Sequence, residues 1–571
     1  MAYDLVVRNG TVIDGSGAPA YRADIGVIGD TIAAIGRIGE RGANEVDAEG
    51  HFVAPGFIDG HTHMDAQVCW DPLGTCSSWH GVSTVVMGNC GFTVAPCRSS
   101  EKYLAIRSLE RAEDISGAAM EAGIDWRWET FSQYLDVVEA LPKGINYSGY
   151  IGHSALRSYV MGERSFEQAA NGDDLAAMQA ELRSALHAGA IGFSTSRSLN
   201  HATSDDKPVA SRLASWDEVR MLVNTMGELG TGVFELAQEH YTDDEPRRDY
   251  YQRLQALTIE SGRPTTFVLG AAGGPTSELW RYMLGVVEDT VAKGGRMFGQ
   301  VHARQFMSIM GFKVGLPFDR LPSWQPVRSQ PLDRQRALLL DPETRRTLVD
   351  EAMHGPYRDG IGSEARPPVW DMMFLAETDL PPYRSVAQVA AEQHTTPVDV
   401  IIDMSLACDF ELFFMQPFAN HDLDAVLELM RHPLTVVAVS DSGAHVSQII
   451  DASIPTYLLS YWTREKKAFT WEQAVRMLTF DPARLWGFSD RGLVREGFRA
   501  DLAVFDPERI SPGLPTAAVD LPGGAKRLKQ KARGMLALVV NGSVLMRDNE
   551  HTGELPGRLL RGPLASPRGL S

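Results

Sequence analysis

Two histidines, His61 and His63, lie one residue apart in the segment Ala54–Asp65, Ala-Pro-Gly-Phe-Ile-Asp-Gly-His-Thr-His-Met-Asp. Alternate side chains of an extended strand share a face, so the two imidazoles would point the same way. Two imidazoles at this spacing can bind one divalent ion, and imidazole suits zinc, iron and nickel. The same pattern also fits two histidines that make ordinary hydrogen bonds at a strand edge. The pair alone leaves both interpretations open.

An aspartate, Asp441, ends a second apolar segment, Val437-Ala-Val-Ser-Asp-Ser-Gly, far along the chain from the histidines. A carboxylate beside a metal-bound water can take its proton and pass it to a departing nitrogen. An Asp-Ser-Gly sequence also favours a tight turn that the aspartate caps. Spacing alone does not decide between an acid that does chemistry and one that stabilises a turn.

Other residues that could do chemistry also follow short apolar segments. Cys90, in the run Gly88-Asn-Cys-Gly, is either a thiolate ligand or a buried, inert thiol. His153 is either a core histidine or a substrate contact. The weaker candidates for contacting substrate are Arg157, Glu235 and His302.

The middle of the chain alternates between short apolar strands and amphipathic helices. The predicted strands include 82–87, 191–193, 232–236, 266–269, 297–301 and 435–439, and the predicted helices include 175–188, 216–229, 250–261, 279–293, 423–431 and 471–478. This alternation predicts an α/β fold, a (β/α)8 TIM-like barrel. Because chemistry in such a barrel sits at the C-terminal ends of the strands, the candidates above would meet at one face.

Both ends of the chain are rich in β-strand patterns. Asn9-Gly10 and Asn541-Gly542 are each flanked by apolar runs and predict type I′ hairpins. We therefore expect one small β-sandwich domain built from both termini, residues 1–54 plus 487–571, and a barrel over residues 55–486. Residues 303–380, rich in Pro, Arg and Asp, are expected to form an insertion over the active-site face.

The composition excludes some classes of function. Acids outnumber bases, 73 against 54, for a net charge of −19, so we expect no nucleic-acid partner. Five scattered cysteines do not make a disulfide framework. The N-terminus lacks the regions of a signal peptide, and no apolar run is long enough to span a membrane. We expect a cytoplasmic protein without a membrane partner, and homo-oligomer formation is left open.

Several motifs, taken in chain order, resemble those of a known family. Residues 6–15, 53–63 and 439–441 look like the amidohydrolase superfamily. Residues 88–91, 152–153, 189–195 and 540–558 resemble its D-aminoacylase branch, the N-acyl-D-amino-acid deacylases. The resemblance covers both terminal β segments and most of the central region, while 303–380 matches poorly. It implies a metal-dependent hydrolase of C–N bonds, usually with zinc, on a barrel with a composite β-sandwich.

The resemblance also implies roles for individual residues. His61 and His63 match the first metal ligands of the barrel, and Cys90 matches the thiolate ligand of the D-aminoacylase branch. Asp441 matches the final-strand aspartate that binds or approaches the metal and transfers the proton.

Three features depart from the branch. It has a histidine at the end of each of the next two metal-bearing strands, where this chain has Glu235 and the run 267–270, Phe-Val-Leu-Gly. No lysine that could be carboxylated lies between Lys143 and Lys207. The arginine that holds a substrate carboxylate shortly after the aspartate is replaced by Ser442-Gly-Ala-His-Val-Ser. One ion is therefore expected rather than two, and the metal site could be completed by Glu235, His302 or His445.

The resulting hypothesis is a hydrolase that acts on a small-molecule amide with one divalent ion, Zn²⁺ by preference. The ion would be held by His61, His63, Cys90 and Asp441. Asp441 would deprotonate the water and protonate the leaving nitrogen, and His153 would donate to the oxyanion. One alternative is a cyclic-amide hydrolase or deaminase of the same superfamily. The other is a non-catalytic assembly protein that kept the fold.

Overall fold

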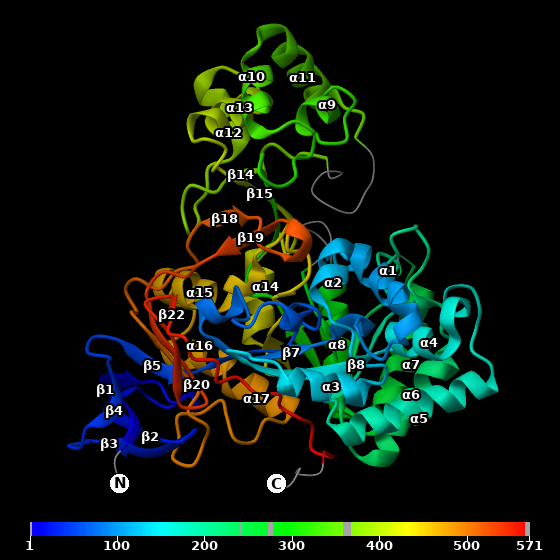
Figure 1. Ribbon diagram of the computed structural model, residues 1–571, viewed down its shortest axis with the longest axis vertical. Helices are drawn as coiled ribbons and strands as arrows, with labels where there is room; N and C mark the ends of the chain where they lie inside the picture. Colours follow the sequence, from blue (N-terminus) through cyan, green and yellow to red (C-terminus); the bar gives the residue numbers. More distant parts are fainter. Residues whose placement is uncertain (1–2, 240, 242, 272–277, 358–366, 566–571) are drawn as a thin grey trace.

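The centre of the molecule is a nearly closed barrel of parallel strands (Figure 1). The computed structural model describes residues 3–239, 241, 243–271, 278–357 and 367–565. The barrel strands, in the order in which they pair, are β6 (Phe57–Asp59), β7 (Val82–Met87), β8 (Asn146–Gly152), β9 (Gly192–Ser196), β10 (Val233–Ala237), β11 (Thr265–Val268), β12 (Met297–Val301) and β16 (Thr435–Val437). The predicted α/β barrel is confirmed.

The barrel closes through the residues that follow its first and last strands. Thr62, after β6, forms a parallel bridge with Ser442, after β16. The amide of Asp441 donates to the carbonyl of His61 at 3.2 Å, and the amide of His63 donates to the carbonyl of Ser442 at 2.8 Å. The backbone that carries the two histidines is thus hydrogen-bonded to the backbone that carries Asp441.

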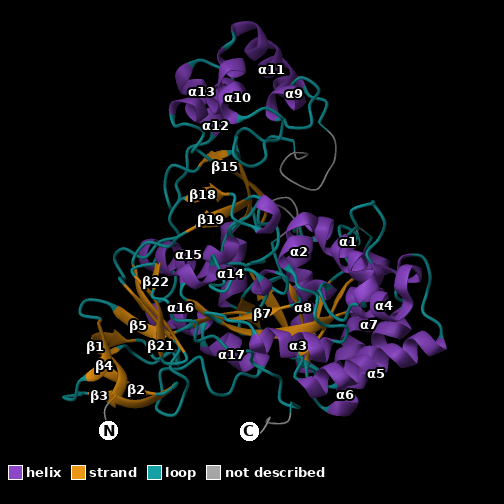
Figure 2. Cartoon of the chain, viewed as in Figure 1, coloured by secondary structure: helices purple, strands orange, loops and turns teal. Residues whose placement is uncertain are grey.

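Helices surround the barrel (Figure 2). They are α1 (Lys102–Ala112), α2 (Gly117–Gly123), α3 (Phe131–Ala140), α4 (His153–Met161), α5 (Gly172–Ala188), α6 (Trp216–Leu229), α7 (Asp244–Ser261), α8 (Leu279–Ala292), α14 (Leu423–Arg431), α15 (Ile454–Tyr457), α16 (Trp471–Leu478) and α17 (Phe480–Trp486). Thr470 and Gln473 form the capping box expected at the start of α16. None of the helices in the described ranges is both long and apolar enough to cross a membrane.

Strands from both ends of the chain share one nine-stranded sheet, as expected for the composite domain. β5 (Phe52–Pro55) pairs with β1 (Tyr3–Val12) on one side and with β17 (Leu502–Phe505) on the other. The remaining strands are β2 (Tyr21–Ile28), β3 (Thr31–Gly36), β4 (Gly42–Asp47), β20 (Met535–Val540), β21 (Ser543–Arg547) and β22 (Glu550–His551). β5 is therefore the strand through which the two termini form one sheet.

The two Asn-Gly pairs have different outcomes. Asn541-Gly542 joins β20 to β21 as a hairpin, as predicted. The hairpin predicted at Asn9-Gly10 is wrong, because β1 runs through both residues and pairs with β2 before and after them. Asn9 is left-handed, with φ of 59°, and the register shifts there, so the pair forms a bulge within one strand.

A separate unit leaves the barrel between β12 and β16 and projects from it at the top of Figure 1. Its sheet consists of β13 (Phe306–Met310), β14 (Phe374–Leu375) and β15 (Phe414–Ala419), and its helices are α9 (Trp324–Arg328), α10 (Leu332–Leu340), α11 (Pro342–His354), α12 (Val386–Gln393) and α13 (Pro397–Ala407). The unit has its own apolar core and continues well past the predicted limit at residue 380. The amide of Ile309 donates to the carbonyl of Gln448 at 2.7 Å, so its base contacts the loop after Asp441.

Candidate functional site

His61 and His63 directly follow β6 and are each 1% exposed. The Nδ1 of His61 donates to Oε1 of Gln300 on β12 at 2.7 Å. This bond fixes the ring so that its Nε2 lone pair faces away from Gln300, the arrangement usual for a metal-binding histidine. The two rings are tilted by 65° with centroids 5.5 Å apart, and both Nε2 atoms approach Asp441.

The separations between these side chains match those of ligands around one ion. Nε2 of His61 lies 3.4 Å from Oδ1 of Asp441 and 3.5 Å from Sγ of Cys90, while Nε2 of His63 lies 3.7 Å from Oδ1 of Asp441. Nitrogen–oxygen hydrogen bonds are shorter, about 2.7–3.2 Å. Two ligands of a tetrahedral zinc ion are about 3.3 Å apart for nitrogen and oxygen, and about 3.6 Å for nitrogen and sulfur. The donor set therefore fits a divalent ion.

Cys90 reaches the histidines from a short turn after β7, η3 (Asn89–Gly91). Its φ of 56° is left-handed, and the glycines on both sides of the Asn-Cys pair are left-handed as well. A Cβ on Gly91 would lie 2.9 Å from Cα of Thr195, so only glycine permits this close approach to β9. His61, His63 and Cys90 each offer a ligand atom within 4.8 Å of the others.

Asp441 is the most accessible member of the group, with 22% of its side chain exposed. It lies in a strained loop, because Val439 and Asp441 both have positive φ, 75° and 49°. Such backbone costs about 1–3 kcal/mol per residue and is concentrated at functional sites. A carboxylate that touches both histidines and also faces solvent can exchange protons with a bound water.

Two further buried carboxylates belong to this site. Glu235, in the middle of β10, accepts from the amide of Cys90 at 2.6 Å, and its other oxygen lies 3.9 Å from Nδ1 of His61. Burial, with the charge of Asp441, raises the pKa of Glu235 to about 8. Glu113 lies 3.4 Å from Nε2 of His63, and burial together with neighbouring acids raises its pKa well above the usual range.

The charges at this site do not balance within the described residues. The ion-pair partners of Glu113 and Glu235 are histidines, with no lysine or arginine among them. Burial lowers the pKa of His61 and of His63, so the protein disfavours the charged imidazolium that would compensate the acids. Buried carboxylates require a cation or a proton. A divalent ion at the histidines would supply the missing positive charge.

Of the other two residues considered for completing the metal site, His302 lies apart from this group and His445 reaches it. His302, after β12, has Nδ1 2.8 Å from the carbonyl of Arg304 and Nε2 3.4 Å from Asp451, and it stacks on Phe306. His445 reaches the site, with Nε2 3.7 Å from Glu113. Of the three residues considered for completing the metal site, Glu235 and His445 are therefore present and His302 faces a different acid.

His153 and Arg157 contact a further acid, Glu218. The Nδ1 of His153 lies 2.8 Å from the hydroxyl of Thr195 and its Nε2 lies 2.9 Å from Glu218. Arg157 donates to both oxygens of Glu218 at 2.6 and 2.5 Å. The side chains of His153, Arg157 and Glu218 are all buried, and both ring nitrogens of His153 already have partners. These contacts form a buried polar network that joins α4 to α6.

Glu113 was missed by reasoning from strand ends, because it follows helix α1 and belongs to no motif.

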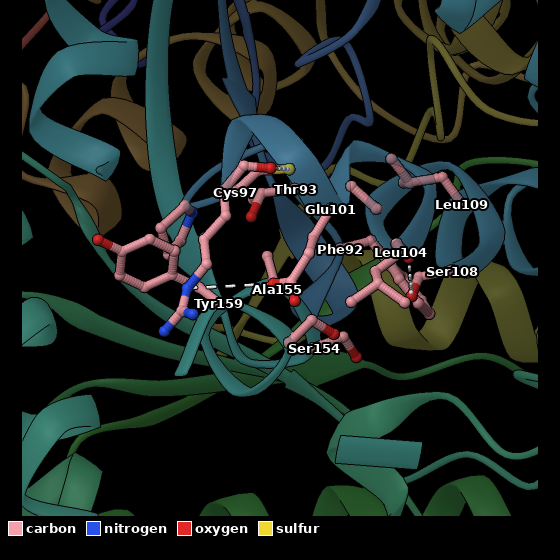
Figure 3. Close-up of a pocket in the computed structure, with 14 residues that line it drawn as sticks. Phe92, Thr93, Cys97, Glu101, Leu104, Ser108, Leu109, Ser154, Ala155 and Tyr159 are labelled. Atoms are coloured by element: carbon pink, nitrogen blue, oxygen red, sulfur yellow. Dashed lines mark hydrogen bonds and ion pairs between the residues drawn. The ribbon is translucent and has the colours of Figure 1, made fainter. Parts of the chain in front are cut away.

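A small and mostly apolar hollow lies between α1 and α4 (Figure 3). Figure 3 shows Leu104 and Leu109 of α1 and Ala155 and Tyr159 of α4 around it. The described residues that line this hollow do not include His61, His63, Cys90 or Asp441.

Comparisons with known proteins agree with this architecture. The amidohydrolase family model matches residues 44–308 and 359–541. The chain is 28% identical to a D-aminoacylase of Alcaligenes xylosoxydans xylosoxydans over 98% of this chain and 97% of the relative, and 28% identical to an N-acyl-D-aspartate deacylase of the same organism over 98% and 95%. A D-aminoacylase crystal structure superposes with a TM-score of 0.65 at 25% identity, covering 98% of this chain and all of that one. Another D-aminoacylase structure concerns the functional role of that enzyme's binuclear metal centre, with activation by one metal and attenuation by the second.

Proposed function

Because this chain belongs to the amidohydrolase family and is a hydrolase of C–N bonds other than peptide bonds, we propose that it deacylates N-acyl-D-amino acids with a metal-activated water. The relatives that align over nearly the whole chain are a D-aminoacylase and an N-acyl-D-aspartate deacylase, both of which act on small amides. The observation that carries the proposal is the set of donor separations of 3.4, 3.5 and 3.7 Å among His61, His63, Cys90 and Asp441.

In this proposal the four residues hold one divalent ion, most simply Zn²⁺. When bound, the ion would lower the pKa of a water and polarise the amide carbonyl. The carboxylate of Asp441 would accept the proton of the attacking water and return it to the leaving nitrogen. Gln300 would keep the Nε2 of His61 in its ligating tautomer through the 2.7 Å bond to Nδ1.

The residues on β10 and β11 that take the place of the family's histidine ligands determine how many ions the site can hold. Glu235 lies in the middle of β10, Val268 is the last residue of β11, and Leu269 directly follows it. A second ion would therefore lack two nitrogen ligands, while Glu235 already accepts the amide of Cys90. We assign one ion for this reason. We do not assign His153 as the oxyanion donor, because both of its ring nitrogens are engaged.

A specific observation favours a second candidate function, hydrolysis of a cyclic amide without a free carboxylate. The residue after Asp441 is Ser442, whose hydroxyl lies 3.0 Å from that of Ser77 and 2.8 Å from that of Ser440. Residues 442–448 are all described and include no arginine or lysine that could hold a substrate carboxylate.

A substrate panel tests the proposal. Purified protein, supplied with Zn²⁺, would be assayed for product release from N-acetyl-D-amino acids, their L-enantiomers and cyclic amides. We expect turnover of the D-compounds, and a loss of about 10²–10⁴-fold in kcat for Asp441→Asn without loss of fold. Turnover restricted to cyclic amides would favour the second candidate. Full activity of the variant would refute the role of Asp441, and no turnover of any amide would indicate a non-catalytic protein.

A further inference from the structure

Glu113 is a buried acid that lies beside His63, one of the metal-ligand candidates, and comes from outside the barrel strands. It is 2% exposed and directly follows helix α1. Its Oε2 lies 3.4 Å from Nε2 of His63 and 3.7 Å from Nε2 of His445. Its Oε1 is buried and has no hydrogen-bond partner among the described residues. The carboxylate therefore has one oxygen between two imidazoles and one oxygen unsatisfied.

These separations are too long for good hydrogen bonds. A charged nitrogen–oxygen hydrogen bond is about 2.7–2.9 Å long, whereas two ligands of one zinc ion are about 3.3 Å apart. The 3.4 Å between Glu113 and His63 equals the 3.4 Å between Asp441 and His61. A carboxylate oxygen of Glu113 therefore lies as far from Nε2 of His63 as a carboxylate oxygen of Asp441 lies from Nε2 of His61.

The surroundings of Glu113 call for a cation. The charged groups that act on it are the acids Asp441, Asp65 and Glu235, and its ion-pair partners are the imidazoles of His63 and His445. Burying a carboxylate without a partner costs several kcal/mol after relaxation. The charges of these three acids all act on the buried Glu113 carboxylate, and a divalent ion would offset their repulsion.

The backbone around Glu113 is fixed on both sides. Its amide donates to the carbonyl of Leu109 at 3.0 Å at the end of α1, and its carbonyl accepts from the amide of His445 at 2.6 Å. The next residue, Asp114, accepts from Ser447 at 2.7 Å and from Gln448 at 2.8 Å. Helix α1 and the loop after Asp441 are thus hydrogen-bonded to each other at Glu113, and a backbone held on both sides suits a residue that supplies a ligand.

We propose that Glu113 is a carboxylate ligand of the metal ion, supplied by the end of α1. It would contribute a hard oxygen donor beside His63, in a chain whose β10 and β11 lack the histidines of its relatives. His445 would act as a positioning residue on the other side of the carboxylate. This inference rests on the proposed function, because it concerns the same ion.

The test compares Glu113→Gln with a control, Glu121→Gln, which removes an exposed acid on the neighbouring helix α2. Zinc content would be measured by mass spectrometry, zinc affinity by competition with a chelator, and cobalt-substituted protein by its visible spectrum. Loss of a residue that only supports a ligand lowers metal affinity about 10–100-fold, so loss of a ligand should cost at least about 100-fold. The cobalt spectrum should change in Glu113→Gln and stay the same in the control.

The outcomes separate this inference from the proposed function. Wild-type protein that binds no zinc would refute the metal-dependent function. Wild-type protein that binds zinc, with a Glu113→Gln variant of equal affinity and an unchanged cobalt spectrum, would overturn the role of Glu113 alone. If Glu113→Gln does not fold, Glu113→Asp keeps the charge and withdraws the oxygens. Weaker zinc binding by this variant supports the proposal, and unchanged binding overturns it.

Discussion

Replacing Arg157 with methionine tests whether the buried network on α4 and α6 is structural. Arg157 is 0% exposed and Glu218 is 1% exposed, and they are joined by two short hydrogen bonds. Arg157→Met keeps the aliphatic bulk but leaves Glu218 buried with only the neutral ring of His153 beside it. Removing one partner of a buried ion pair costs about 3–5 kcal/mol. We expect the free energy of unfolding to fall by that amount.

The assay is urea denaturation of zinc-loaded protein, followed by tryptophan fluorescence. Arg183→Met is the matched control, because Arg183 pairs with Glu228 at the surface, where side chains are 39% and 60% exposed. Such a pair contributes at most about 1 kcal/mol. Glu218→Gln completes the cycle, since Arg157→Met should cost less when the charge of Glu218 is already absent.

Kinetics decide between this reading and a role in substrate binding. The structural reading predicts that Arg157→Met loses stability while KM stays near the wild-type value in the folded fraction. A variant as stable as wild type but with a clearly raised KM would refute this reasoning. That result would instead support the hypothesis, made from the sequence, that Arg157 contacts substrate.

Two further predictions concern other parts of the barrel. Burial lowers the pKa of His80 from 6.5 to about 3, so its stabilising contribution is complete above pH 6.5 and is lost as the pH falls toward 3. Between pH 6.5 and pH 5, the free energy of unfolding of the wild type should fall by about 2 kcal/mol relative to that of His80→Gln. Urea denaturation at both pH values measures this, and a constant difference between the two proteins would contradict the prediction. Gly91→Ala would place a Cβ 2.9 Å from Cα of Thr195 at a φ of 76°, so we expect a loss of at least about 1 kcal/mol together with weaker zinc binding, measured by thermal unfolding and chelator competition. Unchanged values for both would show that the Cys90 turn tolerates a side chain.

Much of the fold and part of the candidate site could be predicted because hydrophobic periodicity and the turn or capping residues that end each element are local signals. The bounds of β7, β12, α6, α14 and α16 agree with the predicted segments, since each is a periodic run with clear ends. His61, Cys90 and Asp441 could be grouped because strands of a barrel end at one face. Their proximity in the structure follows that reasoning.

What could not be predicted depends on contacts between distant segments. Glu113 follows a helix, and only the fold brings it to His63. An Asn-Gly pair favours left-handed backbone in a hairpin and in a bulge alike, so Asn9 could not be distinguished from Asn541 by local sequence. The engagement of His153 by Glu218 depends on a helix more than sixty residues away.

The metal content of the protein shows whether His61 and His63 bind an ion. Wild-type protein and a His61→Asn/His63→Asn variant would be purified without chelator, and zinc, iron and nickel would be counted per chain by mass spectrometry. We expect about one divalent ion per wild-type chain and almost none in the variant. Wild-type protein without a stoichiometric metal that also fails to take up added zinc, or a variant that retains the ion, would contradict it.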